Sequence, residues 1–121
     1  MGSRPSGPRR ADLTAPVRYL LNAPVLSTYG DYRFEGPFTL AQARHFAAQN
    51  VQSAIGHEGT ATFLAQCLHI EVPCQREAIH MQPGDQALVF RLHGRLPEGS
   101  VLDAAALALL PHEFGLLTRL R

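Results

Sequence analysis

The chain lacks lysine entirely: all 11 of its Lys and Arg positions are arginine. A catalytic lysine or a Schiff-base intermediate on lysine is therefore excluded. Any contact with phosphate must come from arginine, histidine or backbone N–H groups, and arginine binds phosphate bidentately. The net charge is only +1. This argues against a protein that binds long nucleic acid through a strongly basic face, but not against binding of a small nucleotide.

Cysteine is also scarce, and long apolar runs are absent. The two cysteines, Cys67 and Cys74, cannot form a disulfide framework. Together with His69 they match no standard zinc pattern, so we expect structural, buried thiols and no bound metal. The sequence shows no run long enough to span a membrane and no signal peptide, which predicts a cytoplasmic protein.

The 121 residues suffice for one compact domain. Residues 1–15, rich in Pro, Gly, Ser and Arg, are expected to form a flexible tail, and residues 16–121 a single domain. Apolar periodicity and turn residues predict helices over residues 40–48, 60–69 and 104–110. They predict strands over residues 17–22, 32–35, 51–55, 77–82, 87–93 and 115–120, the last at a sheet edge. The predicted fold is α/β: a single small domain with a mixed β-sheet of about five strands, flanked by two or three helices.

The segment 51–60 carries the clearest functional signal. A strand is expected to end at Gly56, and a helix to begin near Gly59 or Thr60, which places His57 on the turn between them. The free N–H groups at a helix N-terminus attract phosphate. Histidine transfers protons near neutral pH because its unperturbed pKa is about 6.5. The segment therefore predicts chemistry on a phosphate ester, although a histidine that only completes a turn would give the same spacing.

Four further polar residues follow predicted strands or open them. Asn22 closes the first strand, Arg76 opens the strand at 77–82, and Arg95 and Glu98 lie in the loop after the strand at 87–93. Polar groups at strand ends in α/β sheets gather into one crevice. Each residue also has an ordinary structural role open to it: Asn22 as a turn cap, Arg76 and Arg95 as partners of nearby carboxylates.

In order and spacing, five motifs resemble the viral anti-CRISPR ring nucleases of type III systems and their cellular relatives. These motifs are Leu-Asn-Ala at 21–23, Ser-Ala-Ile-Gly-His-Glu-Gly-Thr at 53–60, Gln-Arg-Glu-Ala-Ile at 75–79, Pro-Gly-Asp-Gln-Ala-Leu-Val at 83–89 and Gly-Arg-Leu-Pro-Glu-Gly-Ser-Val-Leu at 94–102. The resemblance covers about residues 18 to 103. Two positions depart from the viral pattern: Val25 stands where viral members have serine, and Pro97 where they carry an acidic side chain.

The resemblance implies a homodimeric, metal-independent nuclease, without a cofactor, that acts on cyclic tetra-adenylate, the second messenger of type III CRISPR systems. By motif match it implies three catalytic residues, His57, Arg95 and Glu98. It also implies a set of ligand-binding residues: Asn22, Gly56, Arg76 and Arg95. In such a reaction the ribose 2′-OH is an internal nucleophile, the arginines stabilise phosphoryl charge, and His57 suits protonation of the leaving 5′-oxygen. The product would be linear di-adenylate with a 2′,3′-cyclic phosphate.

Two other functions remain compatible with these residues. A non-catalytic module could bind or sequester the cyclic nucleotide in the same pocket, and such a module would not need His57 as an acid. A DNA-binding or structural protein could use the arginines on a polymer backbone, although the near-neutral charge speaks against it.

Overall fold

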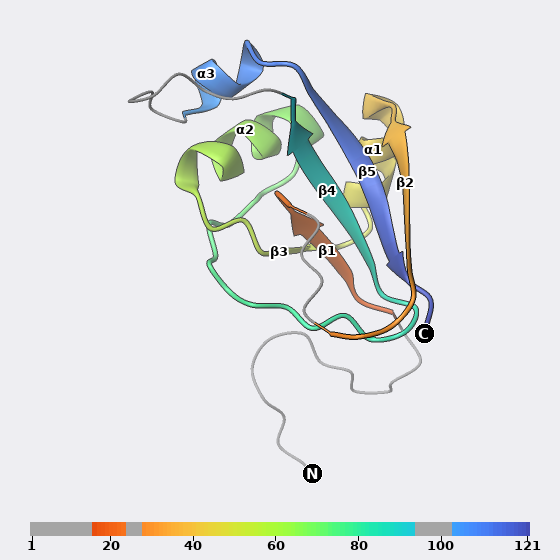
Figure 1. Cartoon of the computed structure of the whole chain (residues 1–121). Coiled ribbons are helices and arrows are strands. Elements are labelled where there is room, and N and C mark those ends of the chain that lie inside the picture. Colours follow the sequence, from red (N-terminus) through yellow and green to blue (C-terminus); the bar gives the residue numbers. More distant parts are fainter. Residues whose placement is uncertain (1–15, 24–27, 94–102) are drawn as a thin grey trace.

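The protein is built around one five-stranded mixed sheet, described by a computed structural model for residues 16–23, 28–93 and 103–121 (Figure 1). The strands are β1 (Arg18–Leu21), β2 (Tyr32–Phe38), β3 (Gln52–Ser53), β4 (Gln86–Leu92) and β5 (His112–Arg119). Their order across the sheet is β2-β5-β4-β1-β3. Strands β1, β3 and β4 are parallel, whereas β5 is antiparallel to both β4 and β2. The predicted α/β class and five-stranded mixed sheet are confirmed. The predicted tail at 1–15 lies outside the described residues.

Three helices supply the main core on one face of this sheet. They are α1 (Leu40–Ala47), α2 (Glu58–Leu68) and α3 (Ala104–Ala108). Apolar side chains from all three join a single cluster with Leu20 of β1, Leu88 and Phe90 of β4 and Phe114 of β5. The prediction for α1 is confirmed, and a capping box formed by Thr39 and Gln42 fixes its start.

The opposite face is covered at one end by residues 77–82, where a strand was predicted and none forms. Ile79 and Met81 are buried there against Leu21, Val89 and other residues of the sheet. The alternation of apolar and polar residues in this segment therefore reflects burial of one side, not a hydrogen-bonded strand. Side-chain periodicity reflects burial, and burial does not require pairing of the backbone.

The predicted C-terminal strand forms, but it does not lie at the edge of the sheet. β5 lies between β2 and β4 and is longer than the edge strand expected at 115–120. Leu117 is buried, Leu116 packs against the helix-side core, and Leu120 is about half exposed. Leu116 and Leu117 thus belong to the core, and Leu120 is the most exposed of these three leucines.

Several element boundaries also shift, and β2 continues to Phe38 instead of ending at residue 35. α2 begins at Glu58 rather than at Gly59 or Thr60, α3 ends at Ala108, and β3 keeps only two paired residues, 52 and 53. Within the residues described, no helix is both long and apolar enough to cross a membrane.

Candidate functional site

The carboxyl ends of the three parallel strands meet at one edge of the sheet. Leu20 of β1 is level with Ser53 of β3 and with Leu88 of β4. Asn22, directly after β1, and Gly56 and His57, shortly after β3, therefore leave the sheet on the same side. This edge is where ligands bind in open α/β sheets. The structure thus brings together residues that lie far apart in the sequence.

His57 stands at the N-terminus of α2, as the sequence predicts. It is the N-cap residue, in extended conformation with φ −124° and ψ 125°, and its carbonyl accepts the first helical hydrogen bond, from the N–H of Ala61. Its side chain makes no capping hydrogen bond and is exposed. The imidazole is therefore available to a ligand beside the positive end of an 11-residue helix. Glu58, in the first turn, offsets part of that positive potential.

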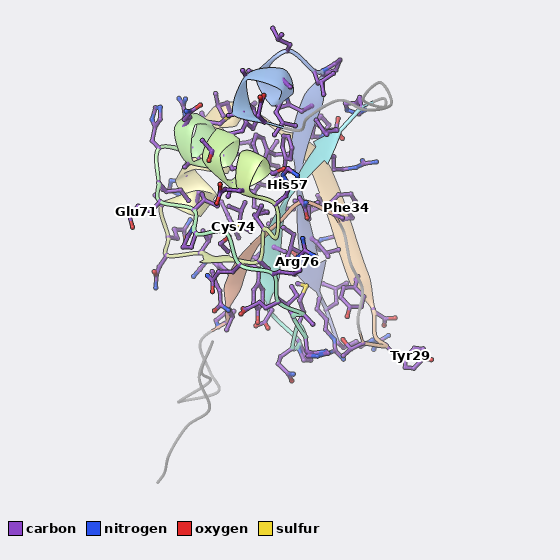
Figure 2. The ribbon with its side chains drawn as sticks, turned by 90° about the vertical axis from the view of Figure 1, so that its left-hand side faces the viewer. Tyr29, Phe34, His57, Glu71, Cys74 and Arg76 are labelled. Atoms are coloured by element: carbon purple, nitrogen blue, oxygen red, sulfur yellow. The ribbon has the colours of Figure 1, made fainter. Side chains whose placement is uncertain are left out.

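Arg76 lies directly over the residue that precedes His57. Its Nη2 donates a hydrogen bond of 3.2 Å to the carbonyl oxygen of Gly56. A Cβ on Gly56 would approach the Cβ, Cγ and Nε of Arg76 to 3.2–3.3 Å, so glycine allows the stem of the arginine to lie close to the strand. Arg76 is exposed, and Figure 2 shows it on the same side of the molecule as His57.

The segment carrying Arg76 is held beside β3 by backbone and side-chain hydrogen bonds. Ser53 Oγ donates to the carbonyl oxygen of Pro73 at 2.7 Å, and the N–H of Gln75 donates to the carbonyl oxygen of Ile55 at 2.9 Å. Ile55 and Cys74 form an isolated parallel bridge. The prediction that Arg76 opens a strand is therefore wrong. Arg76 instead follows the bridge between Ile55 and Cys74, which holds it beside Gly56. The carboxylate partner considered for Arg76 is not found in the described part of the chain.

The two cysteines differ from each other. Cys67 is partly buried, and burial raises the pKa of its thiol, an effect that the nearby Arg44 partly offsets. This agrees with a structural thiol. Cys74 is exposed, so the prediction of a buried thiol is wrong for it: only its backbone is paired, in an isolated bridge to Ile55. Across the three described ranges, no cluster of histidine, cysteine and carboxylate side chains could hold a metal ion.

The other candidate residues lie outside the described part of the chain: Arg95, Glu98, Val25 and Pro97. The strand that leads to Arg95 carries a charged cluster that the sequence did not reveal. Glu113 Oε2 bonds Arg91 Nη1 at 3.3 Å, and Glu113 Oε1 lies 2.9 Å from Nε2 of His93. Only the antiparallel register of β4 and β5 brings these residues together, since Arg91 and Glu113 are 22 positions apart.

Comparisons with known proteins agree with this fold. Residues 18–114 match the STIV B116-like family. Uncharacterized protein 26 of Sulfolobus islandicus filamentous virus (isolate Iceland/Hveragerdi) is 42% identical over 50 residues, which cover 41% of this chain and 42% of that protein. Uncharacterized protein ORF117 of Acidianus two-tailed virus is also 42% identical over 50 residues, covering 41% of this chain and 43% of the relative. The match thus spans less than half the length of each.

A solved structure shares the same architecture. B116 of Sulfolobus turreted icosahedral virus superposes with a TM-score of 0.62 at 18% identity, covering 85% of this chain and 99% of that one. At this identity the likeness concerns the fold alone. Since the family match extends over most of the sheet and all of α1 and α2, the chain belongs to the STIV B116-like family.

Proposed function

We propose that this protein is a metal-independent ring nuclease that cleaves cyclic tetra-adenylate to linear di-adenylate and so ends type III CRISPR signalling. One observation carries the proposal: an exposed histidine at the N-terminus of α2, not used for capping, directly follows a glycine whose carbonyl anchors an exposed arginine. A candidate proton donor, a helix N-terminus and a guanidinium group thus lie beside one another. These are the groups that cleavage of a phosphodiester requires.

The chemistry needs only these groups because the substrate supplies its own nucleophile. The ribose 2′-oxygen attacks phosphorus, its proton leaves to solvent, and the bond from phosphorus to the 5′-oxygen breaks. His57, in its protonated form, donates a proton to that leaving oxygen. Arg76 stabilises charge on the phosphoryl oxygens, with Arg95 in the same role by family resemblance. The new end is a 2′,3′-cyclic phosphate.

A second candidate function is a binding module that sequesters the cyclic nucleotide without cutting it. The exposure of Arg76 and the helix N-terminus favour anion binding under either proposal. The two proposals differ at His57, which binding alone does not need as an acid. In both, the ligand is a small nucleotide in the cytoplasm and not long nucleic acid.

The direct test is incubation with cyclic tri-, tetra- and hexa-adenylate in EDTA, followed by chromatographic separation of the products. We expect cyclic tetra-adenylate to become linear di-adenylate with cyclic phosphate ends at the same rate with or without EDTA. The internal 2′-OH makes a metal-activated water unnecessary. Intact ring after prolonged incubation would leave sequestration as the function. Activity that chelation removes and a divalent ion restores would instead establish metal-assisted hydrolysis.

We further propose a twofold homodimer that binds one ring across its interface. Cyclic tetra-adenylate is symmetric and carries four phosphates, and a twofold dimer presents the same patch twice. Arg76 and Arg95 from each chain would then supply four guanidinium groups to balance those charges. Light scattering should give the mass of a dimer, and titration calorimetry should give one ring per two chains. A monomer that binds one ring per chain would contradict the shared site.

A further inference from the structure

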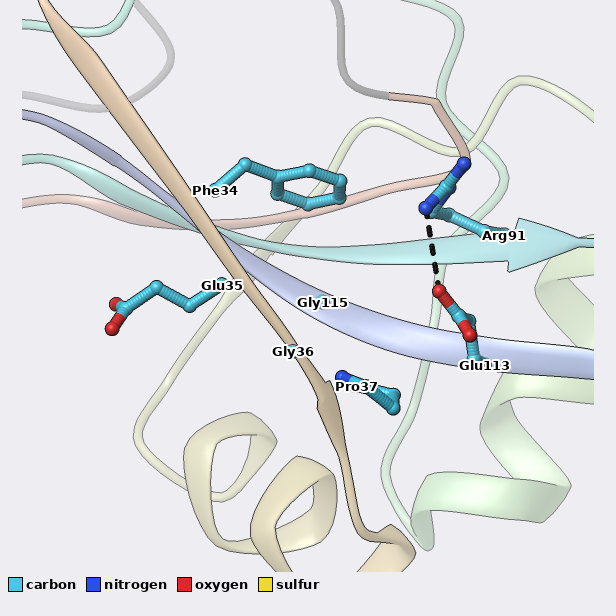
Figure 3. A pocket seen from close by; sticks show the side chains of 7 residues that line it. All are labelled: Phe34, Glu35, Gly36, Pro37, Arg91, Glu113 and Gly115. Atoms are coloured by element: carbon cyan, nitrogen blue, oxygen red, sulfur yellow. Dashed lines mark hydrogen bonds and ion pairs between the residues drawn. The ribbon is translucent and has the colours of Figure 1, made fainter.

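A pocket lies on the sheet face opposite the helices, away from the candidate active site (Figure 3). Strands β2, β4 and β5 enclose a cavity of about 170 Å³. Its lining includes Phe34, Gly36, Pro37, Arg91, Glu113 and Gly115. Residues 77–82 cover the neighbouring part of this face but do not line the pocket, which leaves a concave, open site.

The pocket offers a flat aromatic surface that is held in place. Phe34 is 41% exposed, so part of its ring is accessible to a ligand. Its ring lies on the backbone of β5, because a Cβ on Gly115 would come within 2.8 Å of its Cε1 atom. The guanidinium carbon of Arg91 lies 5.6 Å from the ring centroid. An aromatic ring and a guanidinium are the two side-chain groups on which nucleobases stack.

The electrostatics of the pocket favour a neutral ligand over an anion. Glu113 accepts a hydrogen bond from Arg91 at 3.3 Å and contacts His93 at 2.9 Å, so the positive charge of Arg91 is already balanced. Glu35 also lines the pocket. A phosphate here would meet the carboxylate of Glu113, whereas the Glu35 carboxylate pairs with Arg33 and points away from Arg91 (Figure 3). A carboxylate oxygen has lone pairs for more than one donor, so Glu113 can still accept from an amine of a ligand.

The pocket and the candidate active site both lie toward the carboxyl ends of the parallel strands. Arg91 is three residues past Leu88 in β4, and Leu88 is level with Leu20 and Ser53; Gly56 is three residues past Ser53, after β3 has ended. Strands β3 and β4 are separated only by β1, which places their backbones about 10 Å apart. A nucleotide with its phosphate at Arg76 and His57 would have to direct its base past the end of β1 to reach Arg91 on the face opposite α2.

From these observations we propose that the Phe34–Arg91–Glu113 pocket is a nucleobase subsite that takes an adenine. Phe34 and Arg91 provide the stacking surface, and Glu113 accepts a hydrogen bond from the exocyclic amine. The inference rests on the proposed function, since the base would belong to the same adenylate ligand. It adds a specificity element: the helix N-terminus and Arg76 bind phosphate, and this pocket selects the base.

Adenosine tests the subsite without phosphate and without turnover. In an NMR titration of the isotope-labelled protein, adenosine should shift the amide signals of Gly36 and Gly115. Phe34→Leu should weaken this binding roughly tenfold, because stacking on an aromatic side chain supplies that order of affinity. Phe34→Tyr should retain it. Tyr29→Leu is the matched control, since Tyr29 is a fully exposed aromatic residue outside the pocket.

A second comparison examines the amine. Purine riboside, which lacks only the exocyclic amine of adenosine, should bind several-fold more weakly to the unmodified protein, and Glu113→Ala, which removes the acceptor, should reduce that difference. Adenosine shifts that persist unchanged in Phe34→Leu, or that map elsewhere, would overturn the subsite. The subsite would also be overturned if Phe34→Leu left adenosine binding unchanged and altered only the monomer–dimer equilibrium. That result would mean that this face binds a second copy of the chain. A protein that binds adenosine here but leaves cyclic tetra-adenylate intact would disprove the nuclease and keep the subsite.

Discussion

Replacing His57 with alanine should lower the rate of cyclic tetra-adenylate cleavage by about 10²–10⁴-fold, the usual contribution of a general acid. Binding of the ring should change little, because the imidazole makes no capping hydrogen bond and its loss leaves the start of α2 intact. Single-turnover rates and calorimetric dissociation constants measure the two effects separately. This separation of rate from affinity distinguishes a nuclease from a sequestering module.

His45→Ala is the matched control for this variant. His45 is an exposed histidine on α1, and only its backbone carbonyl takes part in a described hydrogen bond. Its replacement should leave cleavage unchanged. If His57→Ala cuts within about threefold of the unmodified protein, His57 is not the acid. Loss of ring binding together with cleavage would instead assign His57 a role in holding the ligand.

Arg76→Ala should lower kcat/KM for cyclic tetra-adenylate by about 10- to 100-fold, the cost of losing a charge-assisted hydrogen bond to phosphate. The hydrogen bond to Gly56 and the bridge between Ile55 and Cys74 hold this arginine beside the start of α2 before any ligand arrives. Such preorganisation makes the contact strong because little side-chain freedom is lost on binding. Both affinity and turnover should fall, unlike in the His57 variant.

Two further variants sharpen the Arg76 experiment. Arg121→Ala removes another exposed arginine at the opposite end of the sheet, where it pairs with Asp31, and should have no effect on turnover. Gly56→Ala keeps Arg76 but crowds its stem, so it should reproduce part of the loss. Turnover that survives Arg76→Ala undiminished would remove this residue from the phosphate site, whatever the outcome at His57.

Much of the fold could be predicted from local pattern. The run 87–93 became the central strand β4, and Thr39 caps α1, because both features are encoded by neighbouring residues. Two predictions were wrong where the structure depends on pairing between residues that are far apart in the sequence. Residues 77–82 bury Ile79 and Met81 yet form no strand. β5 lies inside the sheet, for which the nearly continuous apolar run of Phe114, Gly115 and Leu117 was the missed signal.

The candidate site was predictable to a similar degree. The turn from strand to helix at His57 follows from a short segment, so its position held. The contact of Arg76 with Gly56 depends on a bridge between residues 19 positions apart, and no periodicity reveals it. The pocket at Phe34 and Arg91 depends on β5 lying between β2 and β4. The sequence pattern predicted an edge position for β5, so this pocket could not be predicted from it.

The two borders of the sheet bear on how copies of the chain can associate. On one side, β2 carries exposed Arg33 and Glu35, a register shift after Glu35, and Pro37, which has no N–H to donate. On the other, β3 has two paired residues and is covered by the segment around Pro73. Both features oppose strand addition. The described edges therefore disfavour edge-to-edge pairing of sheets from two copies, and they favour association through faces or loops.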